Sequence, residues 1–271
     1  MFISNRLIYL QLHKTGCTHI AHLLQELVGG RLIGKHDRLP DGFSKGARLI
    51  MGSIRNPWDW YVSLWAYGCD KKGGLYERLS SPAKQGILGI GKIPVSAVFG
   101  RFGLVRKPEP DWTSFYTSSD NPSQFRKWLR MILDPANRHR LGEGYGKSPI
   151  SRFGGFLTYR YTYLYAGDVV GLYSKSVASH GKLVAFMKRN SVLDYTIRNE
   201  CLESDLVEGL RRSGIELSDR QLGMIYSTSR TNVSSRNRRV NYYYDRETVE
   251  LVRLRERMVI ERYGYEPPSL D

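Results

Sequence analysis

The sequence has little cysteine and no long apolar run. Its 271 residues include three widely spaced cysteines, Cys17, Cys69 and Cys201, without a CxxC pair. This pattern excludes a disulfide framework and a zinc ribbon and is typical of a reducing compartment, so we expect a cytoplasmic location. No stretch approaches the roughly 18 uncharged apolar residues of a membrane span, and the N-terminal segment lacks a small-residue cleavage site. We therefore expect neither a membrane span nor a signal peptide.

Acidic residues are also scarce. Lysine and arginine number 41 against 26 aspartates and glutamates, which gives a formal net charge of +15. Such an excess attracts anions, so nucleic acid, an acidic polysaccharide, a phosphorylated cofactor or a membrane surface would all fit. A basic surface also keeps a protein soluble, and the charge alone does not choose among these. Hydrophobic residues make up 41% of the chain, enough for a sizeable core.

Apolar periodicity predicts strands alternating with helices. The predicted strands cover residues 7–12, 31–35, 47–54 and 192–197, and the predicted helices cover 19–28, 57–68, 123–133, 203–212 and 245–263. This alternation favours an α/β fold with a central parallel sheet flanked by helices and a phosphate-binding loop after the first strand. We expect one domain over 1–271, with a cofactor-binding core in 1–70, an irregular acceptor-binding region in 71–165, and the return of the core in 166–271.

The turn HKTGCT follows the first predicted strand and opens the first predicted helix. In a doubly wound sheet this is where an anion binds, because free backbone N–H groups and the helix dipole point there. Lys14 adds a charge, Gly16 permits close backbone approach, and Thr15 and Thr18 add hydroxyl donors. No glycine precedes the lysine at Walker spacing, which disfavours a nucleotide triphosphatase.

A second anion-binding pattern follows the third predicted strand. Arg55 ends that strand, and Ser63 lies eight residues on, inside the helix that Asn56 and Pro57 begin. An arginine at a strand end and a hydroxyl on the next helix can hold one phosphate from two sides. Three nearby tryptophans fit either base stacking or core packing, and their helical spacing favours the core.

Together the two segments resemble the sulfotransferases that use 3′-phosphoadenosine 5′-phosphosulfate (PAPS). Strand–KTGCT–helix is similar to their 5′-phosphosulfate loop, and RNPWDWYVSLW is similar to their 3′-phosphate motif. The resemblance covers about residues 5–68 well and the last hundred loosely. It implies that the 5′-phosphosulfate is held by Lys14, Thr15, Gly16, Cys17 and Thr18, assisted by Lys35, and the 3′-phosphate by Arg55 and Ser63. Cys17 stands where a hydroxyl residue is commoner, and its position beside a lysine at a helix start predicts a lowered pKa.

The resemblance also implies the catalytic groups. His36, in GKHDRLP, is the expected base, because imidazole accepts a proton at neutral pH. Asp37 is the competing candidate, since some carbohydrate sulfotransferases use a carboxylate. Lys14 would stabilise the charge that develops on the leaving phosphate.

The basic tract before the last predicted helix supplies further candidates. The resemblance places a loop that closes over the 3′-phosphate here, with Ser235, Arg236, Arg238 and Arg239 as its candidate ligands. Alternatively, the tract binds nucleic acid or another polyanion by itself, with Tyr242, Tyr243 and Tyr244 as stacking platforms. The same tyrosines also fit simple packing beneath the last helix.

The sequence therefore predicts a PAPS-dependent sulfotransferase that transfers a sulfuryl group to a hydroxyl or amine by in-line displacement, leaving PAP. A carbohydrate is the expected acceptor, and the charge favours an anionic polysaccharide. We expect no metal and no nucleic-acid partner. The alternatives are a nucleotide-dependent kinase of related fold and a non-catalytic polyanion-binding module.

Overall fold

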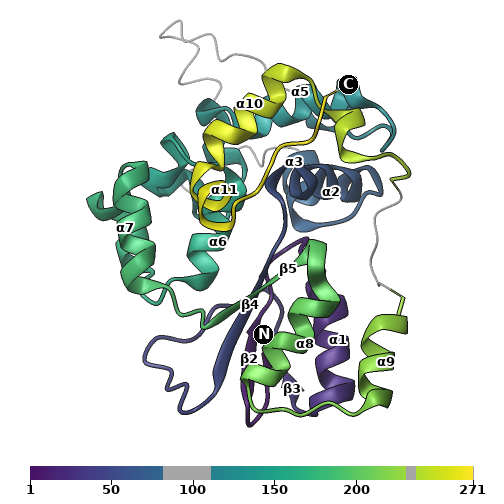
Figure 1. The fold of residues 1–271 in the computed structure, drawn as a ribbon. Helices are drawn as coiled ribbons and strands as arrows, with labels where there is room; N and C mark the ends of the chain where they lie inside the picture. The colour runs from purple at the N-terminus through teal and green to yellow at the C-terminus, as the bar shows by residue number, and fades with distance from the viewer. Residues whose placement is uncertain (82–110, 230–235, 271) are drawn as a thin grey trace, which may run out of the picture.

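The computed structural model describes residues 1–81, 111–229 and 236–270 and contains a five-stranded sheet with helices around it (Figure 1). The strands lie in the order β3-β1-β2-β4-β5. Their bounds are β1 Phe2–Ile3, β2 Leu7–Leu10, β3 Arg31–Leu32, β4 Leu49–Ile54 and β5 Tyr195–Arg198. The expected mixed α/β class is confirmed. The sheet is parallel only across β2, β4 and β5, because β1 pairs antiparallel with both of its neighbours.

The strand predicted over 31–35 is shorter than expected and occupies a different place. Only Arg31 and Leu32 are extended, both are exposed, and they pair with β1 at the edge of the sheet instead of with β2 or β4. Because β1 runs opposite to both β2 and β3, these two strands point the same way. The chain that leaves β3 therefore reaches the same end of the sheet as the turn after β2.

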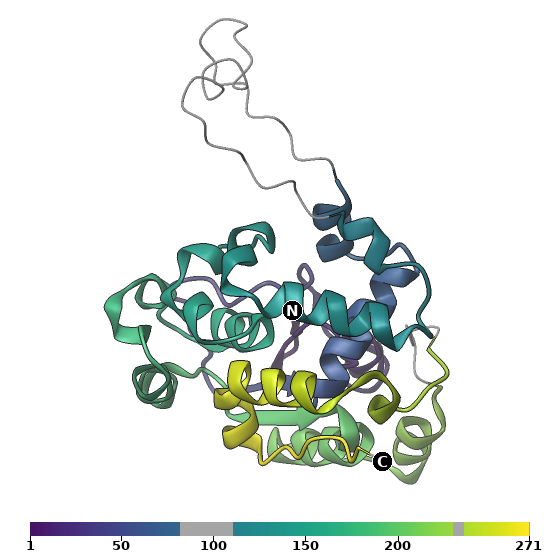
Figure 2. The same ribbon diagram turned by 90° about the horizontal axis from the view of Figure 1, so that it is seen from above.

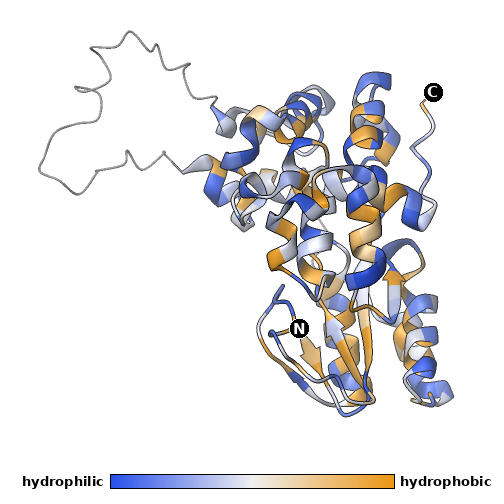
Figure 3. Cartoon of the chain, turned by 90° about the vertical axis from the view of Figure 1, so that its left-hand side faces the viewer, coloured by the Kyte–Doolittle hydropathy of each residue, from blue (hydrophilic) through white to orange (hydrophobic). Residues whose placement is uncertain are grey.

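The two faces of the sheet carry separate apolar clusters, as the alternation of side chains in a strand requires. Leu7, Tyr9 and Met51 face one cluster, together with the buried sides of α1 (Cys17–Val28) and α8 (Leu202–Arg212). Ile8 and Leu10 face the other, larger cluster. The strands accordingly appear mostly apolar when coloured by hydropathy (Figure 3).

Most other helices gather beyond the end of the sheet at which β2 and β4 finish (Figures 1 and 2). They are α2 Pro57–Cys69, α3 Gly74–Ser80, α5 Pro122–Leu133, α6 Phe156–Tyr165, α7 His180–Asn190, α10 Arg246–Arg255 and α11 Arg257–Tyr263, while α9 (Asp219–Ser227) lies beside α8. None of the helices in the described parts of the chain is long and apolar enough to cross a bilayer.

Helix α2 begins as its sequence predicts. The Asn56 side chain accepts a hydrogen bond from the Trp58 backbone N–H at 3.0 Å, and Pro57 occupies the first turn. Trp58, Trp60 and Trp65 are all buried, which confirms their assignment to the core.

Four helices in the described parts of the chain, α3, α6, α7 and α9, fall where the sequence predicted none. Helix α6 reads FLTYRYTYLY and is buried nearly all round, so it lacks the polar face that reveals a surface helix. The region 71–165 is consequently more regular than expected.

The single helix predicted over 245–263 is two helices, α10 and α11, divided at Glu256. The fully buried Glu256 carboxylate accepts hydrogen bonds from the Leu157 and Thr158 backbone N–H groups, at 3.3 and 2.7 Å, and from the Tyr61 hydroxyl. It thereby caps the N-terminus of α6, which has no cap of its own. The break in the last helix brings this carboxylate to α6.

Candidate functional site

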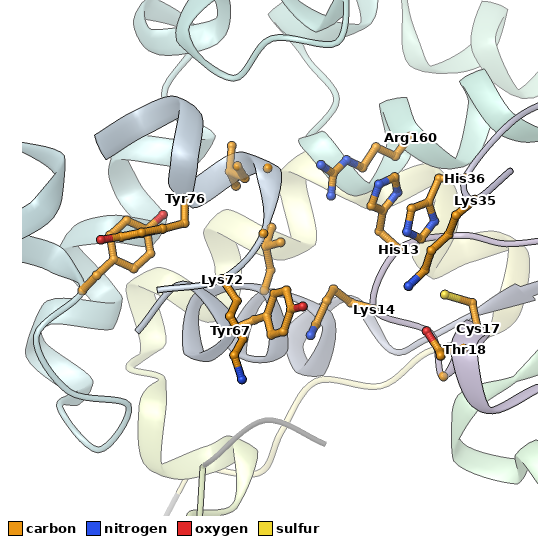
Figure 4. Close-up of a pocket in the computed structure, with 16 residues that line it drawn as sticks. His13, Lys14, Cys17, Thr18, Lys35, His36, Tyr67, Lys72, Tyr76 and Arg160 are labelled. Carbon is orange, nitrogen blue, oxygen red and sulfur yellow. The ribbon is translucent and has the colours of Figure 1, made fainter. Parts of the chain in front are cut away.

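A cavity of about 260 Å³ lies beside the turn between β2 and α1 (Figure 4). Its wall combines residues from that turn, from the segment after β3, from the end of α2 with α3, and from α6. Four cationic side chains line it, Lys14, Lys35, Lys72 and Arg160, together with His13 and His36. No carboxylate from the described residues contributes to the lining. The cavity therefore favours an anionic occupant.

The turn that opens the cavity is built on left-handed backbone. Lys14 has φ 63° and Gly16, the N-cap of α1, has φ 74°. A Cβ atom at position 16 would lie 2.7 Å from Leu202 Cδ1 and 2.8 Å from Asn199 Nδ2. Gly16 is thus required for two reasons, its dihedral angle and its close contact with the start of α8.

The N-terminus of α1 lies at the cavity wall. The first helical hydrogen bond runs from the Ile20 N–H to the Gly16 carbonyl, at 3.0 Å. The N–H groups of Cys17 and Thr18 precede this bond, so no backbone carbonyl of the helix accepts from them. Gly16, Cys17 and Thr18 all line the cavity, as the sequence predicted for an anion-binding loop.

The side chain of Thr15 faces the protein interior and not the cavity. Its side chain is fully buried, and its hydroxyl donates to the Leu12 carbonyl at 2.8 Å and pairs with the Ser53 hydroxyl at 2.6 Å. Ser53 in turn pairs with the Tyr9 hydroxyl at 2.7 Å. The Thr15 hydroxyl therefore ties the turn to β2 and β4 and is not directed to the cavity.

Lys14 is held over an aromatic ring. Its Nζ lies 3.8 Å from the centroid of Tyr67, near the end of α2 (Figure 4). Burial, and next the charge of Arg55, lowers the pKa of Lys14 to about 8. The ammonium group is thus a fixed, partly desolvated charge, and such a charge interacts strongly with an anion.

His36 and His13 stack at the centre of the cavity wall, with ring centroids 3.5 Å apart (Figure 4). His36 Nδ1 lies 2.7 Å from the Gln11 carbonyl oxygen, which can only accept, so Nδ1 carries the proton and donates it. The lone pair of the neutral ring therefore remains on Nε2. Burial lowers the pKa of His36 to about 4, although the hydrogen bond to Gln11 opposes this, and burial also lowers the pKa of His13. Both rings are neutral at pH 7.

Asp37 is not part of the cavity wall. The side chain is exposed and folds back against Gly34, where an added Cβ would collide with the Asp37 carboxylate. Its charge acts on the N-terminal amino group, whose pKa it raises against the larger lowering effect of burial. Of the two candidate bases, the structure brings only His36 to the cavity.

The expectation of an acidic Cys17 thiol is wrong. Cys17 does start α1, and its thiol is buried. Burial raises its pKa, and the opposing charges of Lys35 and Lys14 do not compensate. Cys17 contributes its backbone N–H and its position to the site, and not a reactive thiolate.

The second predicted group is assembled around Asp59, in the first turn of α2. Arg55 donates Nε to Asp59 Oδ2 at 2.6 Å, and Arg236 donates Nη2 to Oδ1 of the same carboxylate. Burial would raise the pKa of Asp59, but Arg55 and Arg236 together lower it. Arg55 Nη1 also donates to the Lys14 carbonyl at 3.2 Å, which links this group to the turn after β2. The structure thus brings together two of the predicted 3′-phosphate ligands.

The other members of that predicted set have varied positions. Ser63 is buried on α2, one helical turn beyond Asp59. Arg238 lies over the ring of Tyr242, 5.3 Å from its centroid, and Arg239 is exposed. Ser235 falls outside the described residues. None of Arg55, Ser63 and Arg236 lines the cavity.

Sequence reasoning missed several cavity residues. The most informative is Arg160, the only charged residue in the aromatic segment FLTYRYTYLY. A lone arginine in such a segment is the signal that could have found it, since a buried charge requires partners. Lys72 and Tyr76 carried no comparable signal, because they lie beside or in α3, a helix that the sequence did not predict. Tyr67 lies in the predicted helix over 57–68, where nothing in the sequence distinguishes it from a core residue.

The aromatic residues of the middle region form core. Aromatic residues of this region could either stack on the sugar rings of an acceptor or pack in the core, and the sequence does not decide between these roles. Five of them are buried, namely Trp112, Tyr116, Trp128, Tyr159 and Tyr161, and Tyr116 also lines the cavity. Tyr243 and Tyr244 are likewise buried, whereas Tyr242 is exposed. The tyrosine tract is therefore mainly packing beneath α10, and not a set of stacking platforms.

Comparison of the chain with protein-family models, with curated proteins and with solved structures found no match.

Proposed function

We propose that the chain is a PAPS-dependent sulfotransferase whose cofactor occupies the turn between β2 and α1. The observation that carries the proposal is the cavity itself, which joins four cations and a helix N-terminus to a neutral histidine. Bound PAPS would supply an activated sulfuryl group, transferable to an acceptor oxygen or nitrogen. The chain's own residues then have three tasks: to bind phosphate, to hold the acceptor and to accept its proton.

In this proposal, the phosphates are bound by the turn between β2 and α1 and by the arginines around Asp59. Gly16, Cys17 and Thr18 offer backbone N–H groups, and Lys14 offers a charge already fixed over Tyr67. Arg55 and Arg236 are preorganised by one shared carboxylate. Because these arginines converge from distant parts of the sequence, their meeting beside the turn supports the resemblance of RNPWDWYVSLW to a 3′-phosphate motif.

Proton acceptance falls to His36. The hydrogen bond from Nδ1 to Gln11 fixes the tautomer and leaves Nε2 as the basic atom. A pKa of about 4 makes the free imidazole a weak base. A bound dianion would raise that pKa toward neutrality by stabilising the imidazolium, so the base is strengthened when the donor is in place.

The alternatives receive less support. A kinase requires a carboxylate that binds magnesium. Beside the arginines proposed to bind phosphate, Asp59 has a carboxylate, and this group already forms ion pairs with Arg55 and Arg236. It therefore has little affinity left for a magnesium ion. The cationic side chains of the site line a small cavity instead of an extended track, which a polyanion-binding module would need.

The test is calorimetric titration of the protein with PAP, with MgATP and with heparin. We expect PAP to bind and MgATP to bind much more weakly. Lys14→Ala and Arg55→Ala should each weaken PAP binding roughly tenfold or more, because each removes a charge-assisted contact. Lys188→Ala, on the exposed side of α7, removes the same charge and is the control. PAP binding that survives both variants would exclude the cofactor site proposed here, and heparin binding alone would favour the polyanion module.

A further inference from the structure

Arg160 is a buried arginine whose contacts within the protein do not by themselves explain its position. Its side chain is 5% exposed and lies 4.2 Å from the ring centroid of Phe156 on the same helix, α6. Nε donates to Glu143 Oε2 at 2.9 Å, and Nη2 donates to Oε1 at 2.5 Å. This paired contact uses one edge of the guanidinium and fixes the plane of the group.

Glu143 adopts an unfavourable backbone conformation at this contact. It has φ 56°, between Gly142 at φ 76° and Gly144 at φ 83°. Three successive left-handed residues are costly when the middle one has a side chain, and such a conformation persists only where its surroundings fix it. The Tyr159 hydroxyl does so here by donating to the Glu143 carbonyl. The conformation presents the Glu143 carboxylate to Arg160.

The third nitrogen of the guanidinium, Nη1, is buried and has no hydrogen-bond partner among the described residues. Arg160 lines the cavity, and its guanidinium group lies beside His13, on the side away from His36 (Figure 4). A buried N–H donor without a partner is costly in a folded protein, and a ligand can relieve that cost. The fixed guanidinium therefore offers N–H donors to whatever occupies this end of the cavity.

We propose that Arg160 binds an oxyanion carried by the acceptor, a carboxylate or sulfate group near the reacting hydroxyl. This subsite rests on the proposed function for its role in the reaction. In Figure 4 the stacked histidines lie between Arg160 and the turn residues Cys17 and Thr18, with His13 next to Arg160 and His36 beyond it. An acceptor anchored at Arg160 would present its neighbouring hydroxyl to His36. Glu143 acts as a positioning residue for Arg160.

The test uses benzoate, a small carboxylate with an apolar body, and its neutral analogue benzamide. Both are titrated into the protein with and without saturating PAP. We expect benzoate to bind and benzamide to bind at least tenfold more weakly, because only benzoate forms a charge-assisted hydrogen bond. Arg160→Lys should weaken benzoate binding about tenfold and change PAP affinity less than twofold. Glu143→Gln should tighten benzoate binding, since the guanidinium then lacks its internal counter-charge.

Arg255→Lys is the matched control. Arg255 is also 5% exposed, and one of its guanidinium nitrogens, Nε, has no hydrogen-bond partner among the described residues, but Arg255 does not line the cavity. It should leave benzoate affinity unchanged even where it lowers the melting temperature. Equal benzoate affinity in wild type, Arg160→Lys and Glu143→Gln overturns the subsite, as does equal loss in Arg160→Lys and Arg255→Lys. If Arg160→Lys does not fold, Glu143→Gln decides. Arg160-dependent benzoate binding without any PAP binding keeps the subsite and rejects the sulfotransferase.

Discussion

The rings of His13 and His36 lie face to face, with their centroids 3.5 Å apart and their planes inclined by 15°. Two imidazolium ions would repel each other strongly at this distance. Arg160 and Lys35 add to the repulsion, and both lower the pKa of each ring. The pair is thus a neutral surface within a cationic cavity, and its proton affinity depends on what the cavity holds.

The first prediction concerns stability against pH. Burial places the pKa of His36 at about 4 in the folded protein, below the usual 6.5, and lowers that of His13 as well. Between pH 6.5 and 4 the unfolded chain therefore binds more protons than the folded one, so the free energy of unfolding falls as the pH is lowered. His36→Asn should make the melting temperature less dependent on pH between 7 and 5. His139→Asn, at an exposed position, is the control, and an unaltered slope in His36→Asn contradicts the prediction.

The second prediction concerns Lys14 and PAP affinity. Because burial lowers its pKa to about 8, the free protein loses this positive charge as the pH rises from 7 to 9. PAP affinity should fall over that range by a factor approaching that of Lys14→Ala. Lys14→Arg keeps its charge at all these pH values and should give a flatter profile by calorimetry. Parallel profiles for wild type and Lys14→Arg would show that another group controls the binding.

The third prediction separates the arginines of the C-terminal tract. Arg236 shares Asp59 with Arg55, whereas Arg238 lies over Tyr242. Arg236→Ala should weaken PAP binding about tenfold, and Arg238→Ala, with the same loss of charge, should weaken it less than twofold. Titration calorimetry at one salt concentration measures both. Equal effects would mean that only the net charge of the tract matters.

The fourth prediction assigns the base. His36→Ala should lower the rate of PAP release from PAPS, with 4-nitrophenol or desulfated heparin as acceptor, by about 10²–10⁴-fold while PAP affinity stays nearly constant. Asp37→Asn should retain most of the rate, because Asp37 folds against Gly34 and lies off the cavity wall. The assignment is wrong if Asp37→Asn abolishes turnover and His36→Ala does not.

The fifth prediction tests the geometry of the turn. Gly16→Ala places a Cβ within 2.8 Å of two side chains on a backbone with φ 74°, so it should destabilise the protein by about 1–3 kcal/mol and weaken PAP binding. Gly181→Ala is its counterpart within α7, where a Cβ meets nothing within 4 Å. That change should stabilise the protein by up to about 1 kcal/mol. Chemical denaturation of both variants provides the comparison.

Local patterns predicted the parts of the fold that depend on near neighbours. The apolar run of β2, the Asn56–Pro57 start of α2 and the glycine before α1 each act within a few residues, so the sequence alone reveals them. The strand at 31–35 was misplaced because its pairing partner, β1, is a two-residue strand too short to leave a pattern. Helix α6 was not predicted from the sequence, because burial on nearly all sides removes the apolar periodicity that indicates a helix.

The residues of the candidate site show the same difference between local patterns and long-range contacts. The turn residues and Arg55 were found because they sit at strand ends, which sequence patterns locate. The cavity role of Arg160 and the ion pair between Arg236 and Asp59 depend on contacts between residues more than a hundred positions apart in sequence, and no local pattern encodes them. The family resemblance predicted Arg236 as a candidate 3′-phosphate ligand, but nothing in the sequence predicted its ion pair with Asp59.

Because Glu256 caps α6, the N-terminus of this helix cannot be capped until a much later part of the chain has been synthesised. The turn between β2 and α1 and the start of α2 lie within the first 70 residues, and α6, which carries Arg160, is complete by residue 165. Yet the carboxylate that caps α6 belongs to residue 256. On the ribosome, the turn between β2 and α1 is therefore made long before the Arg160 end of the cavity can become rigid. A chain released short of residue 256 would keep this turn but lack the carboxylate that caps the helix carrying Arg160.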